Sequence, residues 1–451
     1  MAADNNTAVI LPDTRAYISA GSRAFADAVI IYALWVYFAA YPFIFRNLAT
    51  PIYSMALNAS LVLVGFTLLF RPRIPSPAPL FRPVSFRIAG LFYIAYFIVL
   101  ISVSLSNSGS PVVGKAAMIR IRDAMFVMIL IIFLSEKGIY KMIRLYLNVL
   151  AFFAVLGLVL EALIFLGLVH PLTEVSLDNL PGLSENHRLF YGIGFVWPDT
   201  WVGSLVGLER LQSFADEAGT FAFALTPAIL FAFKWGMKWR AAVMSAALIF
   251  TFSIGAIALW VVIVTVYFLS RRERKAIYIW AFAILLICLA VSLTAVFLYM
   301  PDIWKMGENY FMAKFGDDNN VTSVGQRWSD LKIVILKVLD HPLGFGSGSL
   351  GVAFGKGVSL AIGWFIPLAE AGLVGWLLYL LAFGFVLQRA VRDVFWSRGI
   401  VGIAALIIVI NGYAALQRAG IDSNIWQWFW LTTYLRLSAA EAQVRSAGIP
   451  A

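Results

Sequence analysis

The sequence predicts an all-α, polytopic membrane protein, and three observations lead to this fold class. Hydrophobic residues make up 61% of the 451-residue chain and charged residues only 13%, far from the composition of soluble globular domains. Apolar runs close to the roughly 20 residues that a helix needs to cross a bilayer recur along the chain. Lysine and arginine gather in alternate connections between these runs. We therefore expect a single integral membrane domain over residues 1–451.

The apolar runs divide into about twelve expected transmembrane helices. They cover residues 24–45, 51–70, 88–106, 118–135, 145–168, 217–234, 238–253, 255–270, 276–299, 361–387, 399–415 and 422–437. The stretch from Ala241 to Leu269 is long for one span and short for two, and Ser253 with Gly255 gives its only turn signal. The charge distribution favours dividing this stretch, because a merged span would invert half of the chain.

Basic residues predict the orientation, because cytoplasmic loops carry an excess of lysine and arginine. With twelve spans and both termini in the cytoplasm, the inner loops hold Arg71, Arg73, Arg82, Arg87, Lys137, Lys141, Arg144, Lys234, Lys238, Arg240, Arg271, Arg272, Arg274, Lys275, Arg389, Arg392 and Arg398. Two long polar excursions, 169–212 and 300–360, then lie on the extracytoplasmic side, where we expect them to carry short interfacial helices. Inner-loop topology explains most of the net charge of +10, so nucleic acid is not expected as a partner.

A minority of basic residues faces outward against this bias and indicates an anionic ligand there. They include Lys115, Arg120, Arg122, Arg188, Arg210, Lys305, Lys314, Arg327, Lys332, Lys337 and Lys356. A guanidinium group suits phosphate oxygens, and at a bilayer surface these belong to lipid head groups or lipid-linked diphosphates. The three histidines have no metal-ligand spacing and no phosphate-loop pattern is present, so we expect no metal and no cofactor.

One candidate site is the stretch 209–222, which leads from the first excursion into the sixth span. Arg210 stands near its start, and Asp216 with Glu217 falls at the expected first helical turn. Carboxylates at that position are favoured by the helix dipole, so the acidic pair is either a helix cap or a functional pair at the membrane edge.

A second candidate site is the stretch 325–348 in the second excursion. Arg327 precedes Trp328, Leu331, Ile335 and Val338, whose helical spacing predicts one apolar stripe lying on the membrane surface. The glycine-rich segment that follows, His341-Pro342-Leu343-Gly344-Phe345-Gly346-Ser347-Gly348, predicts a turn whose backbone N–H groups suit a phosphate or sugar.

Taken in order, four features resemble the bacterial O-antigen ligase and Wzy-type polysaccharide polymerase superfamily of multispanning inner-membrane glycosyltransferases. They are the segment Arg210 to Ala222, Arg327 with Trp328, the turn from His341 to Gly346, and Glu370-Ala371-Gly372-Leu373-Val374-Gly375. The resemblance covers about the second half of the chain. It implies a GT-C-like architecture in the bacterial inner membrane, with an active site that faces the periplasm.

The chain also departs from the family pattern. Ligases usually carry a His-Asn pair about nine residues before the glutamate, and Ala361 and Ile362 stand there instead. A Ser-Arg-Gly common in the superfamily is replaced by Ser253-Ile254-Gly255. These differences favour a polymerase over a ligase, and a flippase or other transporter remains the non-enzymatic alternative.

The resemblance implies transfer of a glycan from undecaprenyl diphosphate to a sugar hydroxyl of the next lipid-linked repeat unit. It implies membrane lipids, a chain-length regulator and a flippase as further partners. For the diphosphate we expect Arg210 and Arg327, with Lys115, Arg120 and Arg122 either in the same role or as lipid anchors. For the base we expect Glu217 or Asp216, with His341 as the alternative, although His341 also suits a plain turn residue. Glu370 is expected to line the same cavity.

Overall fold

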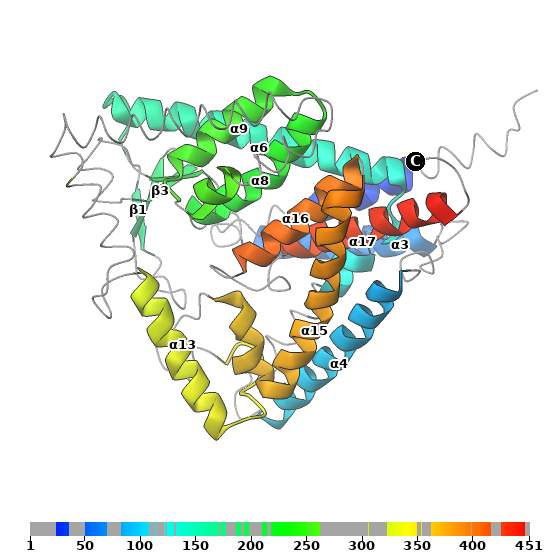
Figure 1. Ribbon diagram of the computed structural model, residues 1–451. Helices are drawn as coiled ribbons and strands as arrows, with labels where there is room; N and C mark the ends of the chain where they lie inside the picture. The colour runs from blue at the N-terminus through cyan, green and yellow to red at the C-terminus, as the bar shows by residue number, and fades with distance from the viewer. Residues whose placement is uncertain are drawn as a thin grey trace, which may run out of the picture.

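The computed structural model is mainly helical (Figure 1). It describes residues 24–35, 50–69, 83–107, 113, 121, 124–129, 132–170, 173–176, 186–190, 194–197, 210–213, 218–253, 255–261, 305, 323–349, 353, 362–397, 399–415 and 425–446. The main helices are α3 (Thr50–Leu69), α4 (Val84–Ser106), α6 (Glu136–Phe165), α8 (Ala218–Lys234), α9 (Lys238–Phe250), α13 (Ser323–Asp340), η3 (Gly363–Phe365), α15 (Ile366–Trp396), α16 (Ile400–Ala414) and α17 (Ile425–Ser446).

Three described helices are long and apolar enough to cross a membrane. They are Val84–Ser106, Lys137–Phe165 and Gly363–Trp396, and shorter apolar helices cover Ala24–Trp35, Ala218–Lys234 and Ile400–Ala414. This finding confirms a mainly helical protein that has three candidate membrane-spanning helices by length and composition. The count of twelve spans and the GT-C-like architecture stay predictions, and the expected ninth span, 276–299, lies outside the described residues.

Local signals set the ends of several of these helices. Pro83 precedes α4, and the Ser135 side chain caps α6 by accepting the N–H of Gly138 at 3.0 Å. Gly167 follows α6 with φ of +67°, and Gly236 separates α8 from α9 with φ of +69°. Both glycines adopt the left-handed conformation that commonly ends a helix.

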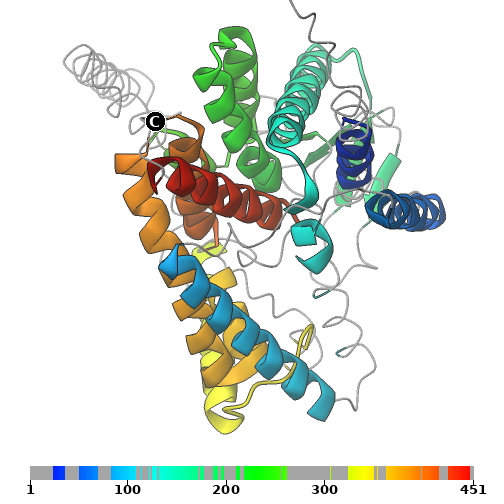
Figure 2. The same cartoon turned by 90° about the vertical axis from the view of Figure 1, so that its right-hand side faces the viewer.

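Helices α4 and α15 pack along each other in opposite directions (Figure 2). Near the start of α4, Phe92 stacks on Phe385, with ring centroids 6.1 Å apart, and farther along Tyr96 meets Tyr379 at 5.4 Å. Because the residue numbers rise on α4 while they fall on α15, the pair is antiparallel. This direction agrees with the expected topology, in which these two spans cross the membrane in opposite senses.

Helices α6, α8 and α9 form a second group, which lies across the top of the molecule in Figure 1. The Tyr146 hydroxyl of α6 donates to the Ala224 carbonyl of α8 at 2.6 Å. The Trp430 ring of α17 lies 5.3 Å from the Tyr146 ring and 5.6 Å from the Phe231 ring. Aromatic packing on α17 therefore connects this group to the rest of the helices.

The first excursion carries a four-stranded antiparallel sheet. Its strands β1 (Thr173–Ser176), β2 (Asn186–Phe190), β3 (Gly194–Trp197) and β4 (Arg210–Ser213) pair in sequence order. This finding differs from the all-α class and from the expectation of interfacial helices in this loop. The physical reason is that β2 and β3 are short runs with aromatic and branched residues, which favour a pleated surface over a helix.

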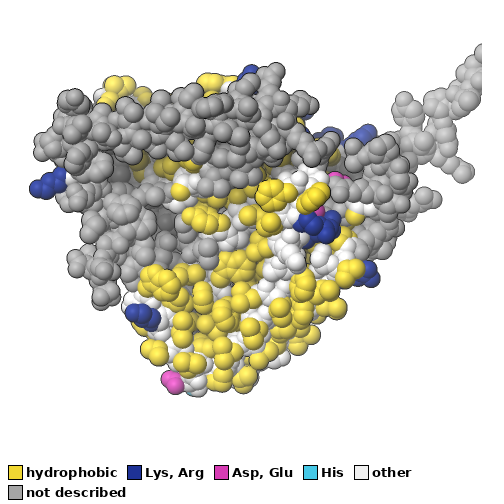
Figure 3. Space-filling view, in the orientation of Figure 1, with side chains coloured by type: hydrophobic (Ala, Val, Ile, Leu, Met, Phe, Trp, Pro, Cys, Tyr) yellow, Lys and Arg dark blue, Asp and Glu magenta, His cyan; other side chains and the backbone are white. Residues whose placement is uncertain are grey.

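The second excursion does form the expected amphipathic helix, α13, but with a different buried face. Leu331, Val334 and Val338 are buried and pack near Leu368 of α15. Trp328 and Ile335, expected on the same stripe, are exposed instead. The prediction of a single stripe was therefore wrong, because apolar residues occur on two sides of the helix and only one side meets α15. Figure 3 shows almost continuous hydrophobic surface over the lower part of the molecule, where α13 and α15 lie.

Candidate functional site

The candidate site begins with a sharp fold in α15 at Gly372. This glycine has φ of 67° and ψ of −168°, outside helical values. The Trp376 indole N–H donates to the Trp364 carbonyl at 2.9 Å, although twelve residues of straight helix would separate them by about 18 Å. A first arm, 363–371, thus folds back on a second arm, 373–396, and the expected span 361–387 is not one continuous rod. Figure 1 shows the two arms meeting at the lower end of the molecule.

The turn 341–349 docks onto this fold, and we call the turn together with residues 369–373 the glycine clasp. Where the helical ladder is interrupted, backbone groups that would pair within a helix pair with the turn instead. The hydrogen bonds run from the Phe345 N–H to the Ala369 carbonyl at 3.0 Å, from the Gly346 N–H to the Glu370 carbonyl at 2.8 Å, and from the Leu373 N–H to the Pro342 carbonyl at 3.0 Å. The bend in α15 and the turn thus supply hydrogen-bond partners for each other's backbone groups.

Glycine is required at two facing positions of the clasp. A Cβ atom added at Gly372 would overlap the Pro342 carbonyl oxygen, and one added at Gly344 would overlap the backbone nitrogen of Gly372. Both residues also have positive φ, at 67° and 86°. The two chain segments approach so closely that neither tolerates a side chain.

The C-terminal end of α4 forms the third side of the clasp. The Ser104 hydroxyl accepts the N–H of Ser347 at 3.0 Å, and it donates in turn to the Leu100 carbonyl at 2.6 Å. The Asn107 side-chain amide donates to the Gly344 carbonyl at 3.2 Å. Three segments that are remote in the sequence therefore converge here: the end of α4, the turn and the fold of α15.

Glu370 lies inside the clasp and is buried, with 5% of its surface exposed. One of its carboxylate oxygens accepts the N–H of Gly348 at 2.9 Å. A carboxylate held by a backbone donor has a fixed position, and it can orient the segment that carries it. Glu370 therefore holds the turn in place rather than standing open to solvent.

His341 stands at the rim of the clasp and is exposed. Its backbone N–H donates to the Lys337 carbonyl at 3.0 Å, which continues the last turn of α13. Its ring meets the edge of the Phe345 ring, with centroids 5.1 Å apart. The imidazole is thus oriented by packing and accessible from outside, as a group that exchanges protons with a substrate must be.

The glycine turn does not provide the phosphate site that its composition suggested. Every backbone N–H from 344 to 349 donates to an acceptor within the protein: His341, Ala369, Glu370 twice, Ser104 and Gly346. None of these N–H groups is left over for a phosphate oxygen. The glycines serve close packing, and the N–H groups of residues 344–349 are not available to an anionic ligand.

The two expected diphosphate-binding arginines have described backbones at separate places. Arg210 opens β4, whose Leu211 packs against Gly157 of α6. Arg327 lies in α13, fourteen residues before His341, which corresponds to about 21 Å along a helix. The remaining predicted site residues lie outside the described residues: Lys115, Arg120, Arg122, Asp216 and Glu217. The structure thus brings the His341 and Glu370 segments together and separates Arg327 from them.

Sequence reasoning missed Ser104 and Asn107, although a weak signal existed. The apolar run of α4 ends in a polar cluster, Ser102 to Asn107, with serine or asparagine at every second position or closer. Such a cluster at the end of a span is compatible with ordinary water contact. Only the approach of a segment about 240 residues away gives it a specific role.

A second polar cluster that the sequence did not single out lies at the other end of α15. Asp393 is buried, and its Oδ2 atom accepts hydrogen bonds from the Arg389 Nε at 3.1 Å, the Tyr434 hydroxyl at 3.0 Å and the Ser438 hydroxyl at 2.9 Å. We call these four residues the aspartate cluster. The Phe86 ring of α4 meets the Tyr434 ring at 5.8 Å, so the cluster also touches the start of α4.

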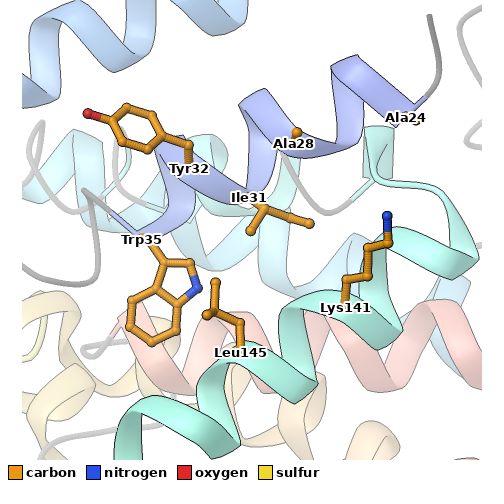
Figure 4. A pocket seen from close by; sticks show the side chains of 7 residues that line it. All are labelled: Ala24, Ala28, Ile31, Tyr32, Trp35, Lys141 and Leu145. Carbon is orange, nitrogen blue, oxygen red and sulfur yellow. The ribbon is translucent and has the colours of Figure 1, made fainter. Parts of the chain in front are cut away.

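An apolar crevice of about 400 Å³ lies away from the clasp (Figure 4). The helix Ala24–Trp35 lines one side of it, and Lys141 with Leu145 of α6 lines the other. Among its described lining residues Lys141 is the one charged side chain, and these residues offer no paired groups for acid–base chemistry. Among the described residues, no three His, Cys, Asp or Glu side chains lie close enough to hold a metal ion.

Comparison with known proteins adds no relative: no protein-family model matches the chain, and a search of curated proteins finds no match. The structure by itself defines a helical protein with apolar helices long enough to be embedded in a membrane.

Proposed function

We propose that this protein is a bacterial polysaccharide polymerase, a metal-independent glycosyltransferase that joins undecaprenyl-diphosphate-linked repeat units. The observation that carries the proposal is the glycine clasp. Two of the four sequence features that resemble the Wzy-type superfamily, the turn 341–346 and the segment 370–375, lie 24 residues or more apart in the chain and dock on each other through backbone hydrogen bonds. Because the two motifs form one structural unit, we interpret them as parts of one functional site.

The position of the clasp along α4 supports an extracytoplasmic site. The clasp contacts Ser104 and Asn107 at the end of α4, whereas Arg87 lies in its first turn. On the antiparallel α15, Arg389 and Arg392 lie toward the end remote from the clasp. Because basic residues mark the cytoplasmic side, the clasp belongs at the opposite, periplasmic side of the membrane. Lipid-linked repeat units are joined on that side in the family that the chain resembles.

The proposed reaction moves the growing glycan from its carrier to the next unit. An acceptor hydroxyl attacks the anomeric carbon of the donor sugar, a new glycosidic bond forms, and the bond from that carbon to the diphosphate breaks. The hydroxyl proton passes to a base, and the undecaprenyl diphosphate leaves with the bonding electrons. The protein must neutralise the leaving group and align both sugars, which together lower the barrier.

The residues take the following proposed roles. Arg210 and Arg327 bind the diphosphate, with Lys115, Arg120 and Arg122 as further candidates. Glu217 or Asp216 accepts the proton, and His341 is the alternative base because its exposed ring stands at the rim of the clasp. Glu370 positions the turn that carries His341 by binding the Gly348 N–H.

The proposal is tested by incubating the purified full-length protein with undecaprenyl-diphosphate-linked repeat units and resolving the products as a glycan ladder. We expect Arg210→Ala and Arg327→Ala to abolish the ladder. If His341 is the base, His341→Ala lowers the rate about 100-fold or more, in the range of general base catalysis. His170→Ala, which removes an exposed imidazole beyond the end of α6, is the matched control and should leave the rate unchanged.

Other outcomes would change the assignment. Single transfer to a lipid-core acceptor, without a ladder, would indicate a ligase. If the folded protein transfers glycan in neither assay, the transporter alternative is favoured. An unchanged rate in His341→Ala would leave the base to Glu217 or Asp216, which their own alanine variants would then show.

A further inference from the structure

A basic cleft lies on α6 at the end opposite to Gly167. It has a volume of about 600 Å³ and is formed between α6 and the connection from α8 to α9. Its lining consists of Arg144, Asn148, Gly236, Met237, Lys238, Trp239 and Arg240. The positive φ of Gly236 turns the chain so that the first residues of α9 face α6. The cleft is remote in sequence from the glycine clasp, and the proposed reaction uses none of its residues.

The described residues that line this cleft carry three positive charges and no carboxylate. Within the described part of the chain, Arg144, Lys238 and Arg240 form no ion pair with an acidic side chain. Three cations that face one hollow repel one another, and this repulsion is relieved when an anion binds between them. The unneutralised charge therefore indicates an anionic ligand.

The guanidinium of Arg240 is held in place. Its Nη1 atom donates to the Asn148 side-chain oxygen at 2.5 Å and contacts the Met237 sulfur at 3.4 Å. Arg240 is half-buried, unlike the exposed Arg144 and Lys238. A fixed planar fork with its remaining N–H groups available suits the paired oxygens of a phosphate group.

The surroundings of the cleft place it at a membrane boundary. Apolar α8 ends at Lys234, and the basic first turns of α6, which carry Lys137, Lys141 and Arg144, precede the apolar stretch of that helix. Trp239 stands beside the two cations of α9 with 74% of its surface exposed. Exposed tryptophan next to basic residues at the end of apolar helices is typical of the interface with lipid head groups.

We infer that this cleft binds the phosphate group of an anionic phospholipid, with Arg144, Lys238 and Arg240 around the phosphate and Trp239 at the level of the glycerol backbone. The same phosphate chemistry would also accept a free phosphate ion, so the experiment separates the two sources. The inference does not depend on the proposed polymerase activity.

The test measures how much phosphatidylglycerol the full-length protein retains. The protein is reconstituted in phosphatidylcholine nanodiscs with or without phosphatidylglycerol, extracted with mild detergent, and examined by native mass spectrometry. The wild type should retain phosphatidylglycerol in preference to phosphatidylcholine. Arg144→Gln and Lys238→Gln should each weaken retention about fivefold, since one basic residue near the surface contributes about that factor.

Arg392→Gln is the matched control, because it removes an exposed basic residue of α15 that does not line the cleft. The inference is overturned if this control loses as much lipid as the cleft variants, or if the double variant Arg144→Gln/Lys238→Gln retains as much as the wild type. Inorganic phosphate is added in a parallel arm. If phosphate binds as tightly as the lipid and displaces it fully, the cleft is a free phosphate site and the lipid assignment is wrong.

Discussion

At one end of the α4–α15 pair, the glycine clasp fastens the helices through backbone hydrogen bonds and through glycines that leave no room for a side chain. At the other end, the aspartate cluster fastens α15 to α17 through one carboxylate oxygen that accepts three donors. The glycine clasp depends on glycines, which have no side chain, whereas the aspartate cluster depends on the side chain of Asp393. Substitutions should therefore damage the two ends by different mechanisms.

The two ends of the α4–α15 pair also differ in what they contribute, because the clasp sets the path of the chain and the aspartate cluster groups polar side chains. The clasp fixes the path of the chain where we place the reaction, mainly through hydrogen bonds between backbone groups, and the Glu370 side chain accepts one further backbone N–H. The aspartate cluster concentrates charge where we place the cytoplasmic side. A rigid frame of backbone hydrogen bonds beside an exposed histidine suits a site that must hold two large sugar chains in register.

The largest effect is expected from Gly372→Ala. The substitution forces a side chain into a conformation that is essentially restricted to glycine and into overlap with the Pro342 carbonyl. Together these terms cost at least about 3 kcal/mol of folding free energy. Thermal unfolding in detergent, followed by tryptophan fluorescence, measures the loss. Gly384→Ala in the same helix is the control, because an added Cβ meets no atom within 4 Å there; equal destabilisation by both variants would contradict the role of the clasp.

A smaller effect is expected from Asp393→Asn. The amide keeps one oxygen but loses the charge that attracts the three donors, and hydrogen bonds to a charged group contribute about 2 kcal/mol. We expect a lower midpoint of unfolding without loss of glycan transfer, since the cluster lies at the end remote from the clasp. The same change at the exposed Asp340 should leave the midpoint unaltered. Loss of transfer in Asp393→Asn at full stability would show that the two ends are coupled.

The smallest effect is expected from Ser104→Ala. The variant removes the acceptor of the buried Ser347 N–H and should destabilise the protein by about 1 kcal/mol. Ser102→Ala, which removes an exposed hydroxyl bonded only to Ile98 one turn earlier, should have almost no effect on the unfolding midpoint. If Ser102→Ala lowers the unfolding midpoint more than Ser104→Ala does, the role of α4 in the clasp is contradicted.

The sequence predicts the apolar helices well, because hydropathy is a local property. Residues 88–106 and 145–168 read as membrane spans; α4 contains the first, and α6 covers the second as far as Phe165. The amphipathic helix before His341 was also predicted, although the stripe it buries was not. Burial of Val334 instead of Ile335 depends on where α15 lies, and periodicity alone cannot supply that information.

The fold at Gly372 could not be predicted for a related reason. Residues 361–387 read as one apolar run, in which a single glycine is compatible with a straight helix. Its conformation is decided by Pro342 and Gly344, about thirty positions earlier. The sheet of the first excursion escaped prediction because its strands have only four or five residues each, too few to establish an alternating pattern.

The hydrogen bond between Ser104 and Ser347 also has a consequence for the order in which the chain matures. The two residues are 243 positions apart, so at ribosomal rates of about 5 to 20 residues per second the end of α4 waits roughly 10 to 50 s for its partner. During that interval Ser104 is able to donate to the Leu100 carbonyl of its own helix. Helix α4, which is synthesised first, can thus remain in the bilayer with the Ser104 hydroxyl hydrogen-bonded until the turn 341–349 is synthesised and docks.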